Sequence, residues 1–140
     1  EHEFILTEYN DQINELINDF SFFENWEDKY QYLIDLGRNV PAMGEDLKIE
    51  ENKLKGCQSV VYFASERQSD DKIIFLAESD AAIVQGLVAL LLRVYSGRTA
   101  SAIRDTEADF LSEIGLDSHL SATRKNGLAS MLGAIKAAAR

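Results

Sequence analysis

Apolar residues recur at helical spacing in the first part of this 140-residue chain. Around residues 7–19, Ile13, Leu16, Ile17 and Phe20 follow one another at intervals of three, one and three positions. This spacing predicts an amphipathic helix with one apolar stripe. Residues 26–36 predict a second helix, which Asn25 caps and Gly37 ends, with an apolar face made by Trp26, Tyr30, Leu33 and Ile34.

The pattern then changes from helical to β. Pro41 opens an acidic stretch that runs to residue 52, where we expect a loop with at most one helical turn. Residues 60–65 and 72–77 are rich in β-branched and aromatic side chains, and a polar segment separates them. These two runs predict an antiparallel hairpin. Residues 53–55 are a candidate for a short third strand.

The remainder of the chain predicts helices. Ser79 and Asp80 are expected to cap a long apolar core helix over residues 81–95. Thr99 and Thr106 have the character of N-caps for two short helices that end near Asp105 and Gly115, and Ser121 begins a final helix. The order predicts a two-layer α+β fold, in which helices flank a short antiparallel sheet of about three strands. We expect one domain over residues 1–140.

Charge and composition limit the function classes. The chain has 24 acidic and 14 basic residues and a net charge of −10, so nucleic acid is an unexpected partner. All of this excess lies in residues 1–70, which hold sixteen Asp/Glu and six Lys/Arg. No segment reaches the ~18 apolar residues of a membrane span, and no secretory leader is visible. We expect a cytoplasmic protein. The final helix is basic, which fits either packing beside the acidic half or partner binding.

Cys57 is the only cysteine, and it lies between Gly56 and Gln58 directly before the first predicted strand. A single thiol cannot form an internal disulfide, and it is too few ligands for zinc or an iron-sulfur cluster. Gly56 would let the backbone turn so that the sulfur projects outward from a loop tip. Composition and spacing alone favour an inert, buried thiol, because free cysteine is among the most buried residue types.

Five sequence blocks together resemble the SufE/CsdE family of sulfur acceptor proteins, which activate cysteine desulfurases. The resemblance runs from Trp26 to the C-terminus. Its blocks are WEDKY with LIDLG at 26–37, Pro41, GCQS at 56–59, SDAAIV with GL at 79–87, and HLS with Arg124 and NGL at 119–128. Tyr62 and Ala122 depart from the residues common in the family, so the SufE-like or CsdE-like subfamily stays open.

The resemblance implies a function and a site. Cys57 would take sulfane sulfur from a cysteine desulfurase, a pyridoxal phosphate enzyme, and pass it to an iron-sulfur scaffold or another acceptor. The protein would be a non-catalytic carrier without cofactor or metal. The thiolate needs local help, for which Lys55 and Arg124 are the candidate cations. We expect the loop to fold back between transfers and shelter the sulfur against Val60 or Tyr62.

Other interpretations stay open at this point. Gly56, Gln58, Asp80 and Arg124 are candidate supporting residues around Cys57. Asp80 fits a helix cap or a restraint on the cysteine loop, and Arg124 fits an ion pair with the acidic half or a contact to the desulfurase. His119 fits a packed imidazole better than a general base. The alternative functions are a Cys-dependent transferase or hydrolase, a cluster scaffold, and a sulfur carrier for a non-cluster acceptor.

Overall fold

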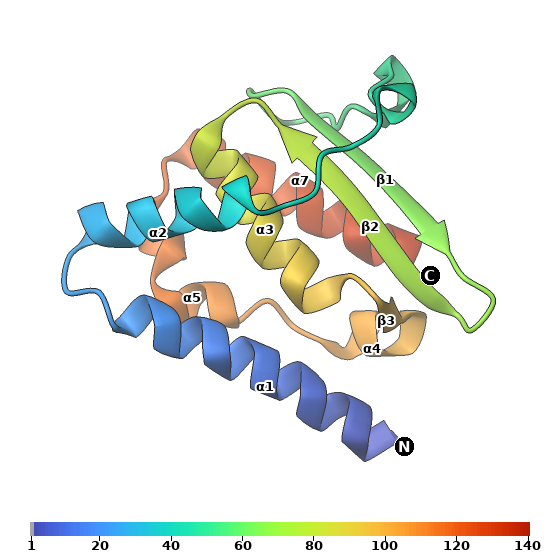
Figure 1. Ribbon diagram of the computed structural model, residues 1–140, viewed down its shortest axis with the longest axis horizontal. Coiled ribbons are helices and arrows are strands. Elements are labelled where there is room, and N and C mark those ends of the chain that lie inside the picture. The colour runs from blue at the N-terminus through green and yellow to red at the C-terminus, as the bar shows by residue number, and fades with distance from the viewer. Residues whose placement is uncertain (1) are drawn as a thin grey trace.

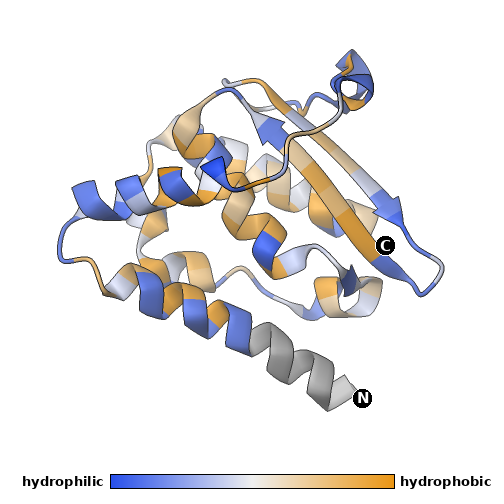
Figure 2. Cartoon of the chain, viewed as in Figure 1, coloured by the Kyte–Doolittle hydropathy of each residue, from blue (hydrophilic) through white to orange (hydrophobic). Residues whose placement is uncertain are grey.

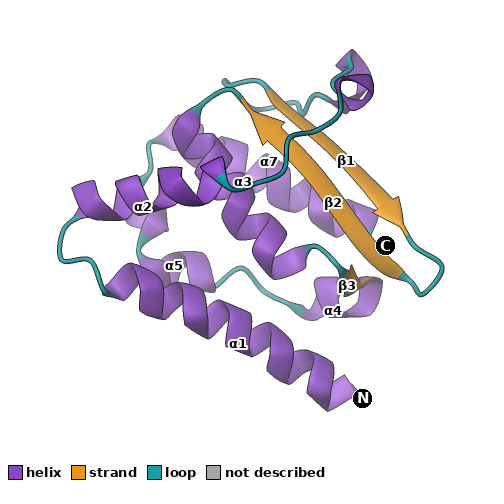
Figure 3. Cartoon of the chain, viewed as in Figure 1, coloured by secondary structure: helices purple, strands orange, loops and turns teal. Residues whose placement is uncertain are grey.

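The computed structural model describes the backbone of residues 2–140 and the side chains from Asp11 onward. Helices and a three-stranded antiparallel sheet of order β1-β2-β3 make an α+β fold, as predicted (Figures 1 and 3). The strands are β1 (Val61–Arg67), β2 (Lys72–Ser79) and β3 (Arg98–Thr99). The helices are α1 (His2–Ser21), α2 (Trp26–Arg38), α3 (Ala82–Tyr95), α4 (Ala100–Asp105), α5 (Phe110–Ile114), α6 (Leu116–His119) and α7 (Ala122–Ala138).

The predicted hairpin is confirmed, but the third strand lies elsewhere. β1 and β2 pair antiparallel, with Val61 opposite Ser79 and Arg67 opposite Ile73. The third strand is β3, which pairs with Lys72 and Ile73 at the other edge of β2. The candidate at residues 53–55 was wrong, because Lys53 makes only an isolated bridge to Tyr62 before the chain turns at Gly56, which has a positive φ of 86°.

Helices α3 and α7 cover one face of the sheet and form the core with it. Between them meet Phe63 of β1, Ala77 of β2, Val88 and Leu91 of α3, and Met131 and Ile135 of α7. The long apolar run of α3 is buried along its length, and β2 is largely orange in Figure 2. α3 therefore lies at the centre of the fold, as its composition predicts.

Two glycines allow α2 to cross α3 at close range. A Cβ atom on Gly86 would lie 2.4 Å from the Leu33 carbonyl oxygen, and one on Gly37 would lie 2.8 Å from the Gln85 backbone. Gly37 was expected to end α2, yet it lies inside this helix, which continues to Arg38. The glycine is needed for its small size at the crossing, so it does not act as a helix terminator here.

Three of the predicted helix caps are confirmed. Side chains of Asn25, Thr99 and Ser121 accept hydrogen bonds from the first turns of α2, α4 and α7. Gly115 ends α5 in the left-handed conformation, as its position suggested. Helix α1 is confirmed and extends beyond residues 7–19 at both ends.

The other caps and short elements differ from the prediction. Thr106 does not begin α5, because its hydroxyl donates to the Ala102 carbonyl at the end of α4 and is buried there. The N-cap of α3 is Ala81, without a side-chain hydrogen bond, so neither Ser79 nor Asp80 has that position. The acidic loop contains two short 3₁₀ turns, Glu45–Leu47 and Glu50–Asn52, where at most one was expected. α6 was not predicted.

The basic side chains of α7 do not pair with the acidic amino half. Lys136 donates to the carbonyls of Ile103, Arg104 and Thr106 at the end of α4. Among the residues described, no ion pair joins α7 to residues 11–70.

No described helix is both long enough and apolar enough to cross a membrane.

The glycine crossing makes a stability prediction. Gly86→Ala forces a methyl group into the Leu33 backbone, and overpacking of this kind costs about 3 kcal/mol. Urea unfolding should show this loss as a lower free energy of unfolding. The matched control is Gly133→Ala in α7, where a Cβ meets nothing within 4 Å and higher helix propensity adds up to about 1 kcal/mol. Equal stabilities of the two variants would contradict the close crossing.

Candidate functional site

The cysteine loop, residues 53–60, connects the second 3₁₀ turn to β1. Its start is tied to β1 by the Leu54 amide, which donates to the Val61 carbonyl at 2.9 Å. Gly56 then adopts a positive φ of 86°, which glycine reaches without strain. A Cβ on Gly56 would lie 2.7 Å from the Ser130 hydroxyl oxygen. The glycine therefore both turns the loop and lets it approach α7 closely.

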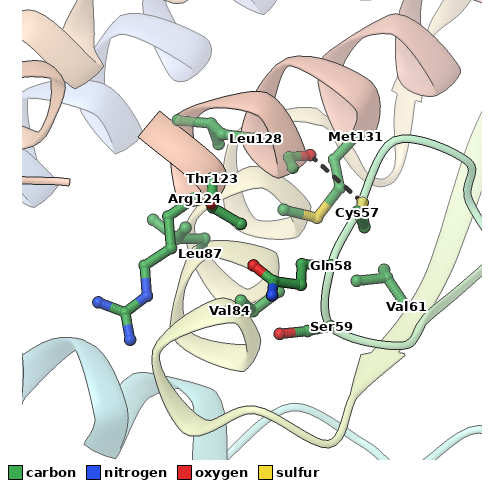
Figure 4. A pocket seen from close by; sticks show the side chains of 11 residues that line it. Cys57, Gln58, Ser59, Val61, Val84, Leu87, Thr123, Arg124, Leu128 and Met131 are labelled. Carbon is green, nitrogen blue, oxygen red and sulfur yellow. Dashed lines mark hydrogen bonds between the residues drawn. The ribbon is translucent and has the colours of Figure 1, made fainter. Parts of the chain in front are cut away.

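The Cys57 side chain points inward, against α7. Its sulfur lies 3.9 Å from the Gly127 carbonyl oxygen, to which the thiol donates (Figure 4). The residue is half-buried. The expectation that the sulfur projects outward was wrong, because the turn at Gly56 directs the side chain toward the helix.

A cavity of about 20 Å³ lies beside the thiol between the loop, α3 and α7. Its apolar walls are Val61, Val84, Leu87, Leu128 and Met131. Val60 and Tyr62 were the expected shelter, but they do not line the cavity, and Val60 is 39% exposed. They point away because successive residues along an extended segment face opposite sides. The Cys57 sulfur is still covered by apolar side chains, and these come from Val61, α3 and α7.

Burial raises the pKa of the Cys57 thiol above its ordinary value. Loss of solvation is the largest cause, and a hydrogen bond from the Ser130 side chain opposes it. Neither Lys55 nor Arg124 contributes to this pKa shift. The docked thiol thus lacks the cationic help that the sequence suggested, and its neutral form is favoured.

Arg124 lies beside the cavity on the first turn of α7, yet its guanidinium extends away from the sulfur (Figure 4). The side chain is exposed, and within the described part of the chain it makes no ion pair or hydrogen bond. The predicted surface ion pair with the acidic half is therefore absent there. Gln58 and Ser59 also line the cavity, which places the whole Cys57-Gln58-Ser59 segment at its mouth.

Asp80 lies outside the Cys57 cavity. It lines a separate groove of about 330 Å³ with Lys48, Val60, Tyr62, Glu78 and Ser79. Lys48 and Glu78 form an ion pair there at 2.5 Å, and Glu78 also accepts from the Met43 amide. Asp80 is exposed and caps no helix. Both groove and cavity flank the cysteine loop, so Asp80 is a neighbour of the loop surface.

His119 has a structural role. Its Nδ1 lies 2.9 Å from the Gly115 carbonyl oxygen, and its ring stacks on Trp26 with centroids 3.8 Å apart. The Tyr30 hydroxyl donates to the His119 carbonyl. His119 does not line the Cys57 cavity, so the packed imidazole is the interpretation that the geometry supports. Trp26 packs against the core, as expected.

Several residues of the site were not identified from sequence, among them three on α7. Gly127, Ser130 and Met131 share one face of α7 at spacings of three and four. The Gly127 carbonyl accepts the hydrogen bond of the thiol, and a Cβ on Gly127 would lie 3.7 Å from the sulfur, at ordinary van der Waals contact. The spacing was visible, but only the docked loop shows that this face meets Cys57. From Asp11 onward, no group of three or more His, Cys, Asp or Glu side chains could hold a metal ion.

Fold and site together define a small α+β domain with one loop-borne thiol docked on a helix. The family model SufE, described as "Fe-S metabolism associated domain", matches residues 14–139. The chain belongs to the SufE family. The resemblance seen in the sequence is thereby confirmed, and the family supports a role in sulfur transfer.

Individual relatives agree with this assignment. An "Uncharacterized SufE-like protein" of Rhizobium meliloti (strain 1021) is 44% identical over 131 residues, covering 91% of this chain and 94% of the relative. One of Rhizobium etli is 41% identical over 132 residues, covering 91% and 89%. A hypothetical protein from Thermus thermophilus, solved in solution, matches with a TM-score of 0.75 at 19% identity over 92% and 93% of the chains. This last likeness concerns the fold.

The raised pKa of Cys57 gives a testable pH dependence. The thiolate, not the thiol, attacks iodoacetamide and displaces iodide, so the pH midpoint of alkylation in the folded protein should lie above that of the same chain unfolded in urea. Ser130→Ala removes the hydrogen bond that lowers this pKa, so the midpoint should move higher still. Ser101→Ala, a helix serine outside the cavity, is the matched control. A folded midpoint at or below the unfolded one would contradict the described environment.

Proposed function

We propose that this protein accepts persulfide sulfur on Cys57 from a cysteine desulfurase, stimulates that enzyme, and passes the sulfur on for iron-sulfur cluster assembly. The observation that carries the proposal is the docked thiol of Cys57, which lies beside a small apolar cavity on a loop that turns at Gly56. Family membership supports the general role. The protein is an accessory carrier rather than an enzyme, because it turns over only with its partners.

The transfer step is a thiol exchange on sulfur. The Cys57 thiolate attacks the outer sulfur of the enzyme's cysteine persulfide, and a new sulfur-sulfur bond forms at Cys57. The sulfur-sulfur bond on the enzyme breaks, and its electron pair leaves with the enzyme thiolate. That thiolate takes up the proton that Cys57 lost, so no external oxidant or reductant is needed. Cys57 ends as a persulfide, and the desulfurase is free for another turnover.

A solitary cysteine suits a carrier of this kind. A second thiol close to Cys57 would attack the persulfide, close a disulfide and release the sulfur as sulfide. Cys57 is the only cysteine of the chain, so this loss cannot occur within the protein. The persulfide can then leave only to an external acceptor.

We expect the cysteine loop to have two states, docked on α7 and released from it, in which the Cys57 thiol differs in reactivity. In the docked state the thiol is half-buried and its raised pKa favours the unreactive neutral form. A desulfurase that draws the loop away from α7 would return the thiol to water and lower its pKa toward the ordinary value. The hydrogen bond to Gly127 and the contacts in the cavity are weak, so the loop can dock and release reversibly.

The alternative of a Cys-dependent transferase or hydrolase has less support. Such an enzyme places a general base within hydrogen-bond reach of the nucleophile. The lining of the Cys57 cavity includes no His, Asp, Glu or Lys, and its one charged residue, Arg124, points away (Figure 4). Delivery to a non-cluster acceptor uses the same exchange step and differs only in the final recipient. The proposed exchange needs a reduced Cys57 thiol, and the reducing cytoplasm keeps thiols in that form, so a cytoplasmic location fits the proposal.

The first test is direct detection of the cargo. Incubation with a cysteine desulfurase and free cysteine should add about 32 Da, one sulfur atom, to the intact protein, and dithiothreitol should remove it. Cys57→Ser should acquire no such mass under the same conditions. An adduct of equal yield on the serine variant, or none on the native chain with an active desulfurase, contradicts the proposal.

Arg124 provides a second test, of the partner surface. Its exposed guanidinium beside the loop suits a contact to the desulfurase, and a loss of about 1 kcal/mol of binding free energy there lowers the transfer efficiency about fivefold. Arg124→Ala should therefore slow sulfur transfer without changing the alkylation of Cys57 in the free protein. Lys125→Ala, which removes an equal charge outside the cavity lining, is the control. Equal effects of the two changes would rule out a specific contact.

A further inference from the structure

A second surface feature lies at the turn that joins α1 to α2, where Phe22 and Phe23 follow the last residue of α1. Phe22 is 80% exposed, more than any other large hydrophobic side chain described. Figure 2 shows this turn as an orange stretch between hydrophilic segments. An aromatic ring left this far in water costs solvation free energy, which a binding partner would recover.

The rings line a groove, which we call the Phe22 groove. Its lining residues are Asn18, Asp19, Phe22, Phe23 and Tyr32, and its volume is about 290 Å³. The Phe22 and Phe23 rings lie edge to face, with their centroids 5.4 Å apart. The centroids of the Phe23 and Tyr32 rings are 5.2 Å apart, and the two ring planes are tilted by 37°. Beneath them the buried Phe20 ring meets Tyr32 edge-on at 5.1 Å. The wall formed by Tyr32 is therefore fixed by core packing, while Phe22 is presented to solvent.

Several sources make the groove electrically negative. Asp19 lines it and accepts a hydrogen bond from the Tyr32 hydroxyl at 2.8 Å through one carboxylate oxygen. Asp19 is also in the last turn of α1, where the helix dipole is negative and where no basic residue lies. Residues 11–28 contain six Asp/Glu and no Lys or Arg. The aromatic faces add the negative side of their quadrupoles.

The surroundings of Tyr32 agree with this negative potential. Burial, then the hydrogen bond and charge of Asp19, raise the pKa of Tyr32 to about 12. One basic side chain, Arg93, opposes this rise in the pKa of Tyr32 through its charge and a hydrogen bond. Arg93 is held from α3 by Gln12 and Glu15 and does not line the groove. The groove itself is thus lined by aromatic and acidic or amide side chains.

We propose that the Phe22 groove binds an arginine side chain from a basic segment of a partner protein. A guanidinium group is planar, stacks on aromatic faces, and donates two parallel hydrogen bonds to a carboxylate. The groove offers both features side by side in Phe22 and Asp19. It shares no lining residue with the Cys57 cavity. The groove is therefore a docking point separate from the proposed sulfur-acceptor site.

The test is an NMR titration of the full chain with N-acetyl-arginine methylamide, with the neutral citrulline analogue as the matched ligand. The proposal predicts saturable shifts centred on the amides of residues 18–23 and 32, and none with citrulline. Phe22→Ala and Asp19→Asn should each weaken binding about fivefold or more. Asp11→Asn removes the same charge from an exposed position on the same helix and should stay within about twofold.

Three results would overturn the proposal. They are shifts spread evenly over acidic surfaces, the same affinity in the Asp19 and Asp11 variants, and the absence of saturable shifts. Because Phe22 is exposed, its replacement leaves the core intact, and a far-UV circular dichroism spectrum like that of the native chain verifies the fold. Sulfur loading of Cys57 does not enter this experiment, so its outcome is separate from that of the proposed sulfur-acceptor function.

Discussion

The contact between the cysteine loop and α7 is the constraint on which the site depends. Gly56 makes it possible by turning the loop against Ser130, and the Gly127 carbonyl accepts the hydrogen bond of the thiol. The same contact takes the thiol partly out of water and raises its pKa. Reactivity and position are therefore coupled, because whatever lifts the loop from α7 also restores the solvation that favours the thiolate.

The rest of the fold holds the two sides of this contact in place. α3 and α7 pack together on one face of the sheet, and both supply walls of the Cys57 cavity. α3 is positioned by its close crossing with α2, where Gly37 and Gly86 remove the side chains that would keep the helices apart. The start of the cysteine loop is fixed to β1 by the hydrogen bond from the Leu54 amide to the Val61 carbonyl. The cysteine loop is thus held between β1 and the packed helices α3 and α7.

Local sequence signals predicted most of the elements, and contacts between distant segments account for what they missed. Helical spacing and the caps Asn25, Thr99 and Ser121 act within a few residues, so they could be read directly. β3 is two residues long and exists because Gly97, with a positive φ of 78°, brings it beside β2. Gly37 looked like a helix end, because its true role depends on α3, which lies about fifty residues further along the chain.

The site residues also divide into those that local sequence signals identify and those that depend on contacts between distant segments. Cys57 and Gly56 were identifiable from the lone cysteine and its glycine neighbour, whereas the inward direction of the sulfur depends on Gly127 and Ser130, which are about seventy residues away. Lys55 and Arg124 were chosen for charge alone, and neither affects the docked thiol, because both side chains are exposed and Arg124 extends away from the sulfur. Charge near a cysteine in sequence does not determine which groups share its solvent environment.

We propose that docking on α7 restrains Cys57 until a desulfurase releases it. The most direct measurement is the alkylation rate of Cys57 at fixed pH, alone and with a desulfurase variant that lacks its active cysteine and cannot transfer sulfur. We expect slow alkylation of the free protein by iodoacetamide and a clear increase in the rate when the partner is added. Rapid alkylation of the free protein, at the rate of the unfolded chain, would contradict it.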